Sequence, residues 1–357
     1  MNTADASGKR KMTVNQNQTT HDLPYRCPGL LFSNVYQEPG TADAVCSELL
    51  SRNPEAGALL RAFLLYYRGE TEESAQLAAK LLKDNCCFET RIGCCNILSL
   101  QALYHGDDET WRNARKTLAL TACSTEQENA QVELYKGAMD SGLFIKSTYP
   151  DWFLEGCFDP IPVDDYPCLR YLYAKLLYME FNYEKLAAVV IPFISQSRAE
   201  HALLSEIYLR IVAASGFQTV GDNEKAEKQL VKALELALPD HIYSPFAENH
   251  RHLGPLLENI MKNMDSDAWN TVAKLGDRIQ TGWTHLYNEL FGKKITNELT
   301  PREYDTARLA LSGMSNGEIA ERMGVSVNTV KFYLRNIYEK LHISSRKDLI
   351  PYMWEEV

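Results

Sequence analysis

Apolar residues recur at helical spacing along most of the chain. In the segment 222–238, Ala226, Leu230, Leu234 and Ala237 fall at positions i, i+4, i+8 and i+11, on one face of a helix. Strict alternation of apolar and polar residues, which would indicate strands, is scarce. The same spacing predicts helices over 55–68, 71–84, 88–104, 107–121, 125–140, 164–180, 183–195, 198–215, 222–238 and 265–290. We therefore predict an all-α chain.

Glycines separate these predicted helices with a loose period. Gly69, Gly106 and Gly142 lie between helices at steps of 37 and 36 residues, and Gly221 marks a later boundary. A period in this range is typical of stacked helical hairpins, because one hairpin cannot bury its own apolar face. The pattern therefore predicts a tetratricopeptide-like helical-repeat superhelix over residues 23–290, which would serve signal reception or oligomerisation.

The last 60 residues carry clear helix-start and helix-stop signals. Thr300–Glu303 and Ser315–Glu318 are capping boxes, in which a side-chain oxygen accepts from an amide that the first turn leaves unpaired. Ser345–Asp348 is a close variant of this box, and Ser326 is placed to cap a further helix. Gly313 and Gly324 mark the ends of two helices. These signals predict a four-helix unit within residues 291–357, with helices over 301–312, 316–323, 327–341 and 346–354.

The predicted helix 327–341 has two chemically distinct faces. Its apolar stripe, suited to pack against Ile319, Ala320 and Met323, consists of Val330, Leu334, Ile337 and Leu341. The opposite face carries Asn328, Lys331, Phe332 and Arg335. Between residues 326 and 347 there are five basic residues and one acid. A basic stripe on one helix face is the electrostatic pattern of a nucleic-acid-binding surface, whereas an ordinary solvated face more often mixes charges of both signs.

Residues 299–349 resemble the LuxR/NarL/GerE family of bacterial DNA-binding domains. The matching pieces align without gaps and are Leu-Thr-x-Arg-Glu (299–303), Ser-Asn-x-Glu-Ile-Ala (315–320), Thr-Val-Lys (329–331) and Lys-Leu-x-Ile-x-x-Arg (340–346). The resemblance implies a helix-turn-helix whose third helix enters the major groove of double-stranded DNA. It also implies a sequence-specific transcriptional regulator that acts as a homodimer on DNA, and it leaves contact with RNA polymerase open.

The resemblance assigns roles to individual positions. The family's base-reading positions fall on Lys331, Phe332 and Arg335, whose chemistry suits guanine O6 and N7 and the thymine methyl. Roles in contacting or positioning the DNA backbone fall on Ser326, Asn328, Thr329, Tyr333, Lys340 and Arg346.

Three positions depart from the family's pattern. Thr306 and Ala307 replace larger apolar residues of the first helix, which predicts a lightly packed core. Tyr333 stands where histidine is more common. Pro351 interrupts the fourth helix, which this family uses for dimer contacts, and a proline there removes an amide donor. The fourth helix is therefore weak support for the dimer that the resemblance implies.

The body offers a weaker resemblance. Residues 221–257 look like the last repeat of the MalT-type regulators, which carry a tetratricopeptide-like superhelix. The chain has no G-x-x-x-x-G-K-[ST] loop, so control by ATP is not supported. Three roles for the body stay open: it senses a small molecule or a partner protein, it dimerises the protein or shields the basic helix, or it is a passive scaffold.

Two other functional classes share part of this sequence pattern. The spacing from Glu-Ile-Ala to Thr-Val-Lys also resembles the promoter-reading domain of sigma factors, although nothing upstream looks like a polymerase-binding region. The second alternative is an enzyme with DNA binding attached. No metal-ligand spacing, phosphate loop or nucleophile elbow appears, so we predict no catalytic residue, no metal and no cofactor.

Composition adds limits on where the protein acts. The formal net charge is −10, and residues 294–357 are neutral, with nine basic and nine acidic residues, so the body carries the whole deficit. Residues 1–22 are polar and are expected to be disordered, with neither a secretory signal nor a membrane span. These features and the odd number of cysteines predict a cytoplasmic protein that has no membrane partner and no disulfide framework.

Four cysteines cluster at Cys86, Cys87, Cys94 and Cys95. Four thiolates could bind zinc or act as a redox pair. Adjacent cysteines on a helix point about 100° apart, however, which is poor geometry for shared tetrahedral ligation. We therefore favour packing as small apolar side chains.

Overall fold

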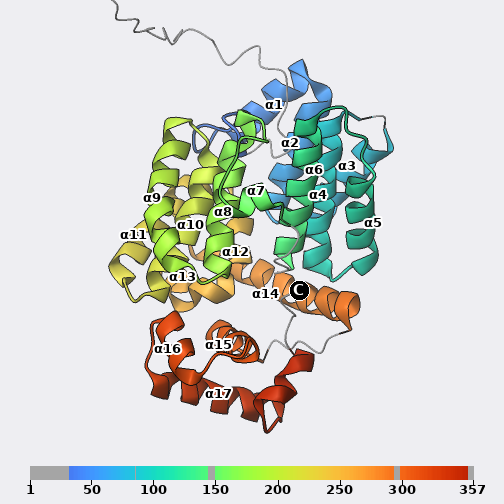
Figure 1. Cartoon of the computed structure of the whole chain (residues 1–357). Helices are drawn as coiled ribbons and strands as arrows, with labels where there is room; N and C mark the ends of the chain where they lie inside the picture. Colours follow the sequence, from blue (N-terminus) through green and yellow to red (C-terminus); the bar gives the residue numbers. More distant parts are fainter. Residues whose placement is uncertain (1–31, 85, 144–148, 293–297, 353–357) are drawn as a thin grey trace, which may run out of the picture.

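The computed structural model describes residues 32–84, 86–143, 149–292 and 298–352, and every regular element in these ranges is a helix (Figure 1). The all-α prediction is confirmed. The segment 1–22, predicted to be disordered, lies outside the described residues. Within the described ranges, no helix is both long and apolar enough to cross a membrane.

The body contains two blocks of helices that lie side by side in Figure 1. The first block consists of α1 (Ala42–Arg52), α2 (Pro54–Tyr67), α3 (Thr71–Lys83), α4 (Phe88–His105), α5 (Asp108–Ala119) and α6 (Glu126–Gly142). The short α7 (Asp151–Leu154) leads to the second block, α8 (Tyr166–Met179), α9 (Tyr183–Ala199), α10 (Leu203–Thr219) and α11 (Asn223–Ala237). Short 3-10 turns precede α8 and follow α11, at Val163–Asp165 and Leu238–Asp240.

Three further helices complete the body. They are α12 (Ser244–Glu248), α13 (His250–Met264) and α14 (Ser266–Phe291), and α14 packs against both α4 and α13. The sequence analysis did not predict α1, α7, α12 or α13. The last of these is broken internally, since Gly254 has φ +49° and Pro255 follows it.

Successive helices pack in pairs, α2 with α3, α4 with α5 and α10 with α11, as stacked hairpins require. Three of the boundary-marking glycines have left-handed backbone angles, φ +86° at Gly69, +68° at Gly106 and +84° at Gly221. A Cβ at Gly69 would meet Leu275 of α14 at 2.6 Å, so this turn also needs glycine for close approach. The superhelical repeat itself stays a prediction.

The cysteine cluster is mostly internal to the first block. Cys94 and Cys95 are fully buried on α4, Cys86 is buried before it, and Cys87 is exposed. Burial raises the pKa of the Cys95 thiol to about 12, so it stays protonated at neutral pH. Among the described residues, no cluster of histidine, cysteine and carboxylate side chains is arranged to hold a metal. The burial supports the packing interpretation.

Candidate nucleic-acid interface

The C-terminal unit begins with three helices whose starts follow the predicted capping signals. They are α15 (Pro301–Leu311), α16 (Asn316–Met323) and α17 (Val327–Leu341). The side chains of Thr300 and Ser315 accept from the amides of Glu303 and Glu318, and the carboxylate of each glutamate accepts from the amide of its cap residue. Gly313 and Gly324 have φ of +87° and +66°, as predicted for helix ends.

The predicted fourth helix is corrected in kind. Residues 346–352 form a 3-10 helix rather than an α-helix. Pro351 lies inside this segment, and since it has no amide hydrogen it cannot extend an α-helical ladder. In the variant capping box, the carboxylate of the last residue is the acceptor. Asp348 accepts from the amide and the hydroxyl of Ser345 at 2.9 and 2.8 Å.

The apolar face of α17 holds the unit together. Val330, Leu334, Ile337 and Leu341 are buried, as are Ile319, Ala320 and Met323 of α16. Thr306 and Ala307, the small residues of α15, are fully buried as well. The Thr306 hydroxyl donates to the Arg302 carbonyl at 2.7 Å and lies 3.5 Å from the Met323 sulfur, so the site is filled and its hydroxyl is satisfied.

The opposite face of α17 points to solvent, on the side of the domain away from the body (Figure 1). Lys331 and Arg335 are exposed, and Phe332 keeps half of its surface in contact with water. The Arg335 guanidinium lies 5.5 Å from the centre of the Phe332 ring, so the two side chains form an exposed cation–π pair. Glu339 is 3.9 Å from Arg335, a loose contact between two exposed side chains.

Four of the six predicted backbone-positioning residues lie near the start of this face. Ser326 caps α17 by accepting from the Thr329 amide at 3.1 Å, and the two hydroxyls are 2.8 Å apart. Asn328 is exposed and Tyr333 is half-buried. The helix start therefore presents hydroxyl, amide and phenol groups beside the exposed basic residues.

The other two, Lys340 and Arg346, have partners within the domain. Lys340 donates to the buried Glu303 carboxylate at 2.6 Å. Arg346 donates to the Met314 carbonyl at 2.6 Å and to Asn316 at 2.9 Å. Both side chains therefore brace α17 and the 3-10 segment against α15 and α16. Sequence reasoning missed these partners, which lie about 30 residues or more away in the chain.

Three arginines of the unit turn the other way, toward the body. Arg302 donates to the Thr219 carbonyl at 3.3 Å, Arg308 to Met179 at 2.8 Å and Arg322 to Glu180 at 2.6 Å. These carbonyls lie at the C-terminal ends of α10 and α8, where helices leave carbonyls unpaired and carry partial negative charge. Arg308 also lies 4.3 Å from the centre of the Phe181 ring.

Apolar packing continues across this junction. Leu299, Tyr304 and Ala307 share one buried cluster with Trp283 and Leu286 of α14. The sequence analysis found none of these contacts, because a helix C-terminus on the body gives no short motif that names its partner. The boundary at residue 291, between body and C-terminal domain, stays a prediction.

Comparison with known proteins agrees with this geometry. Residues 297–353 match the family model described as "Bacterial regulatory proteins, luxR family". No solved structure matches the chain.

Three curated relatives extend the comparison. The HTH-type transcriptional regulator MalT of Vibrio cholerae serotype O1 is 26% identical over 175 residues, covering 44% of this chain and 19% of its own. MalT of Vibrio campbellii is 28% identical over 145 residues, covering 36% and 16%. The transcriptional regulatory protein MctR of Rhizobium johnstonii is 32% identical over 106 residues, covering 29% and 48%.

The chain thus spans less than a fifth of the two MalT proteins and about half of MctR. The 175-residue alignment is far longer than the matched family model, so the similarity to MalT includes part of the helical body. The family match also favours the luxR resemblance over the sigma-factor resemblance, and the relatives carry the names of regulators rather than of enzymes. The segment from residue 297 to residue 353 is a helix-turn-helix domain of the luxR family of bacterial regulatory proteins.

Proposed function

We propose that this protein is a sequence-specific transcriptional regulator that reads double-stranded DNA with α17. The observation that carries the proposal is the exposed face of α17, which presents Lys331, Phe332 and Arg335. The helix itself lies on the side of the domain away from the body (Figure 1). A helix of this diameter fits the major groove, and its exposed donors would reach base edges there. A bacterial regulator that reads genomic DNA works in the cytoplasm.

The three base-reading side chains divide the work by chemistry. Lys331 and Arg335 donate hydrogen bonds and suit guanine O6 and N7, while the half-exposed Phe332 suits a thymine methyl. The cation–π contact between Arg335 and Phe332 limits the rotamers of the arginine before DNA arrives. Asn328, Thr329 and Tyr333 would contact the phosphate backbone from the start of the helix.

Lys340 and Arg346 have a second role in this proposal. Since both are already held by carboxylate or carbonyl partners, their effect on DNA includes the placement of α17. We propose that they position the reading helix and contribute charge near phosphates only from the edge of the site.

The body holds the luxR-family domain with helices α15 to α17, here called the reading domain, in one orientation. Three arginine contacts and a shared apolar cluster join the two parts. Recognition by a homodimer, with two reading helices on adjacent half-sites, fits this arrangement, because a fixed orientation sets the half-site spacing. We infer that other surfaces besides the proline-containing 3-10 segment form such a dimer.

The test is to select binding sites from a random duplex library with the full-length protein and then measure affinities on the selected site. Lys331→Ala and Arg335→Ala should each cost about 1–3 kcal/mol and relax base preference locally. Lys228→Ala is the matched control, since Lys228 is an exposed lysine on α11, and it should leave the affinity unchanged within about twofold.

Salt dependence separates reading from plain charge. Binding should weaken as salt rises, because cationic side chains displace counterions from the phosphates. Enrichment of no sequence in the selection, or equal affinity of both variants and the parent protein on the selected site, would contradict the proposal.

A further inference from the structure

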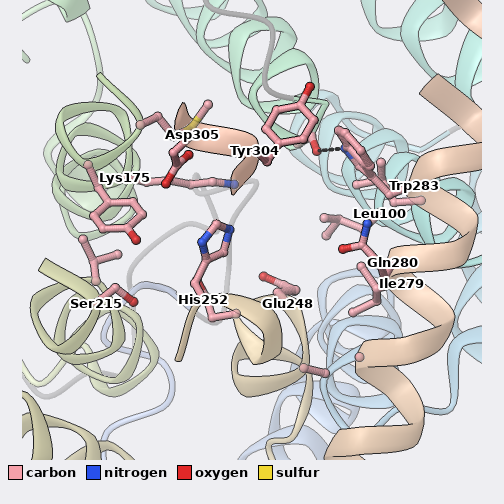
Figure 2. Close-up of a pocket in the computed structure, with 18 of the residues that line it drawn as sticks. Leu100, Lys175, Ser215, Glu248, His252, Ile279, Gln280, Trp283, Tyr304 and Asp305 are labelled. Carbon is pink, nitrogen blue, oxygen red and sulfur yellow. Dashed lines mark hydrogen bonds between the residues drawn. The ribbon is translucent and has the colours of Figure 1, made fainter. Parts of the chain in front are cut away.

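A cavity of about 210 Å³ lies at the junction between the body and the reading domain. Most of its walls come from α4, α8, α10, α12, α13 and α14 of the body, and α15 closes it with Tyr304, Asp305 and Arg308 (Figure 2). A cavity of about 150 Å³ is enough to hold benzene, so this one suits a molecule somewhat larger than a single ring.

One end of the cavity is polar and carries two half-buried charged side chains. Lys175 of α8 and Asp305 of α15 both line it, and within the described residues neither forms a hydrogen bond or an ion pair. Buried charges are normally paired because an unpaired one loses its hydration without compensation. Nearby, the buried hydroxyl of Ser215 also has no partner among the described residues.

Burial acts on both charges in the expected directions. It raises the pKa of Asp305 to about 6, against the lowering effect of Arg308 and Arg302. It lowers the pKa of Lys175, against the attraction of Glu248. A molecule of opposite charge beside each group would oppose these shifts, because it favours the charged form.

Glu248 is already engaged. Its carboxylate accepts from the Tyr66 hydroxyl at 2.8 Å and from the Tyr208 hydroxyl at 3.1 Å. This carboxylate therefore anchors the tyrosine-rich wall and leaves Asp305 as the open acceptor of the cavity.

The other end of the cavity is mostly apolar, with the Gln280 amide as a polar group that donates to the Thr284 hydroxyl at 3.3 Å. Figure 2 shows Trp283, Leu100 and Ile279 across the space from Lys175, Asp305 and Ser215. The indole N–H of Trp283 donates to the Gly142 carbonyl at 3.1 Å, so the indole is fixed in place at this wall. The cavity thus has a donor and an acceptor at one end and an apolar wall at the other.

We propose that the cavity binds a free α-amino acid with an aromatic or branched aliphatic side chain. Its carboxylate would accept from Lys175, its ammonium would donate to Asp305, and its side chain would pack against Trp283, Leu100 and Ile279. A zwitterion satisfies both unpaired groups at once, whereas a simple amine or a simple acid satisfies one and leaves the other buried alone. The cavity volume excludes ligands much larger than one such amino acid.

Such a ligand would act on the reading domain directly. It would bridge α8 of the body and α15 of the domain, so it would favour the docked arrangement over any arrangement that opens the junction. This consequence for DNA rests on the proposed function. The binding itself does not.

The experiment is calorimetric titration of the full-length protein, without DNA, with L-phenylalanine, L-leucine, phenethylamine and 3-phenylpropionate. One of the two amino acids should bind once per chain, and at least tenfold tighter than either analogue that lacks one charge. Lys175→Met and Asp305→Asn should each weaken it about tenfold to hundredfold. Lys274→Met and Asp277→Asn, at exposed positions of α14, are the matched controls and should bind like the parent protein.

Thermal unfolding of each variant checks that it folds, and removal of a half-buried charge that has no hydrogen-bond or ion-pair partner should not lower the transition. Binding of neither amino acid at millimolar concentration would overturn the proposal, as would binding of an amine or acid analogue that equals the amino acid. Equal binding by Lys175→Met, Asp305→Asn and the parent would also overturn it. DNA binding to the selected site, measured on the same preparation without ligand, shows separately whether the proposed function holds.

Discussion

Two groups of basic residues in the luxR-family domain face different surfaces. Arg302, Arg308 and Arg322 point to the body and end on backbone carbonyls. Lys331 and Arg335 point to solvent, and only Arg335 has a nearby acid, at 3.9 Å. The first group attaches the domain, and the second is free to bind something else.

The difference lies in the surface each group faces. The C-terminal ends of α8 and α10 present carbonyls with partial negative charge, which a guanidinium binds without any acidic side chain. Within the described residues, the exposed face of α17 meets no helix end of this kind, so its charges remain available for phosphates and base edges. A count of basic residues therefore overstates a DNA-binding surface, and only the direction of each side chain separates the two roles.

The first prediction concerns the three arginines that face the body. The triple variant Arg302→Ala, Arg308→Ala, Arg322→Ala should lose about 3 kcal/mol of stability, about 1 kcal/mol for each half-exposed hydrogen bond. Its affinity for a single DNA half-site should stay within about twofold of the parent, because α17 and its face are intact. Urea unfolding and fluorescence anisotropy measure the two quantities.

The matched control removes the same charge from the outward face. The variant combines Lys331→Ala and Arg335→Ala on α17 with Lys347→Ala, at an exposed position of the 3-10 segment. It should unfold like the parent protein and lose DNA affinity, since surface substitutions without buried partners change stability little. The comparison fails if both triple variants lose stability and DNA affinity to the same extent.

A second prediction concerns Lys340, a basic residue that faces neither surface. Glu303 is buried and accepts from Lys340 at 2.6 Å and from the Thr300 amide at 2.8 Å. Burial tends to raise the pKa of Glu303, but these hydrogen bonds and the Lys340 charge outweigh it and hold the pKa below its usual range. Glu303→Gln should keep the capping box and cost about 1–2 kcal/mol at pH 7, a value reduced because Lys340 is 36% exposed.

The pH dependence of that cost identifies its cause. A carboxyl whose pKa is lowered by folding stabilises the protein above its unfolded pKa and loses this contribution as pH falls through the folded pKa. The difference between the parent and Glu303→Gln should therefore shrink below about pH 4, measured by urea unfolding across pH. A constant difference from pH 7 to pH 3 would attribute the loss to packing instead of to the ion pair.

Much of the reading domain could be predicted from sequence because its signals are local. The capping boxes at Thr300 and Ser315 act over three residues, and the start of α15 and both bounds of α16 and α17 match the prediction. The fourth helix was wrong in kind because the caps gave a start while Pro351 set the geometry. The residues Lys331, Phe332 and Arg335 lie on one exposed face, as their spacing required.

The junction could not be predicted, because its partners are distant in the chain. Arg308 reaches a carbonyl 129 residues away, and Arg322 one 142 residues away. Backbone carbonyls carry no residue identity, so no motif marks them as partners. Lys175 and Asp305, which line one cavity, come from helices whose predicted patterns gave no sign that they would meet.

The last prediction concerns Glu339, an exposed acid near the DNA-reading residue Arg335. Glu339 lies one turn after Arg335, and the two exposed side chains are 3.9 Å apart, a pair worth only a few tenths of a kcal/mol. Glu339→Gln should leave stability unchanged within about 0.5 kcal/mol, because an exposed pair of this length contributes little. It should tighten binding to the selected DNA site about twofold at low salt, since Arg335 loses a competing partner and the phosphates lose a nearby negative charge. The gain should fade as salt screens the removed charge, and it should vanish in the Arg335→Ala background if release of the arginine is its source. A gain that persists in that background would assign it to the lost repulsion alone, and weaker binding by Glu339→Gln would mean that Glu339 holds Arg335 in its reading position.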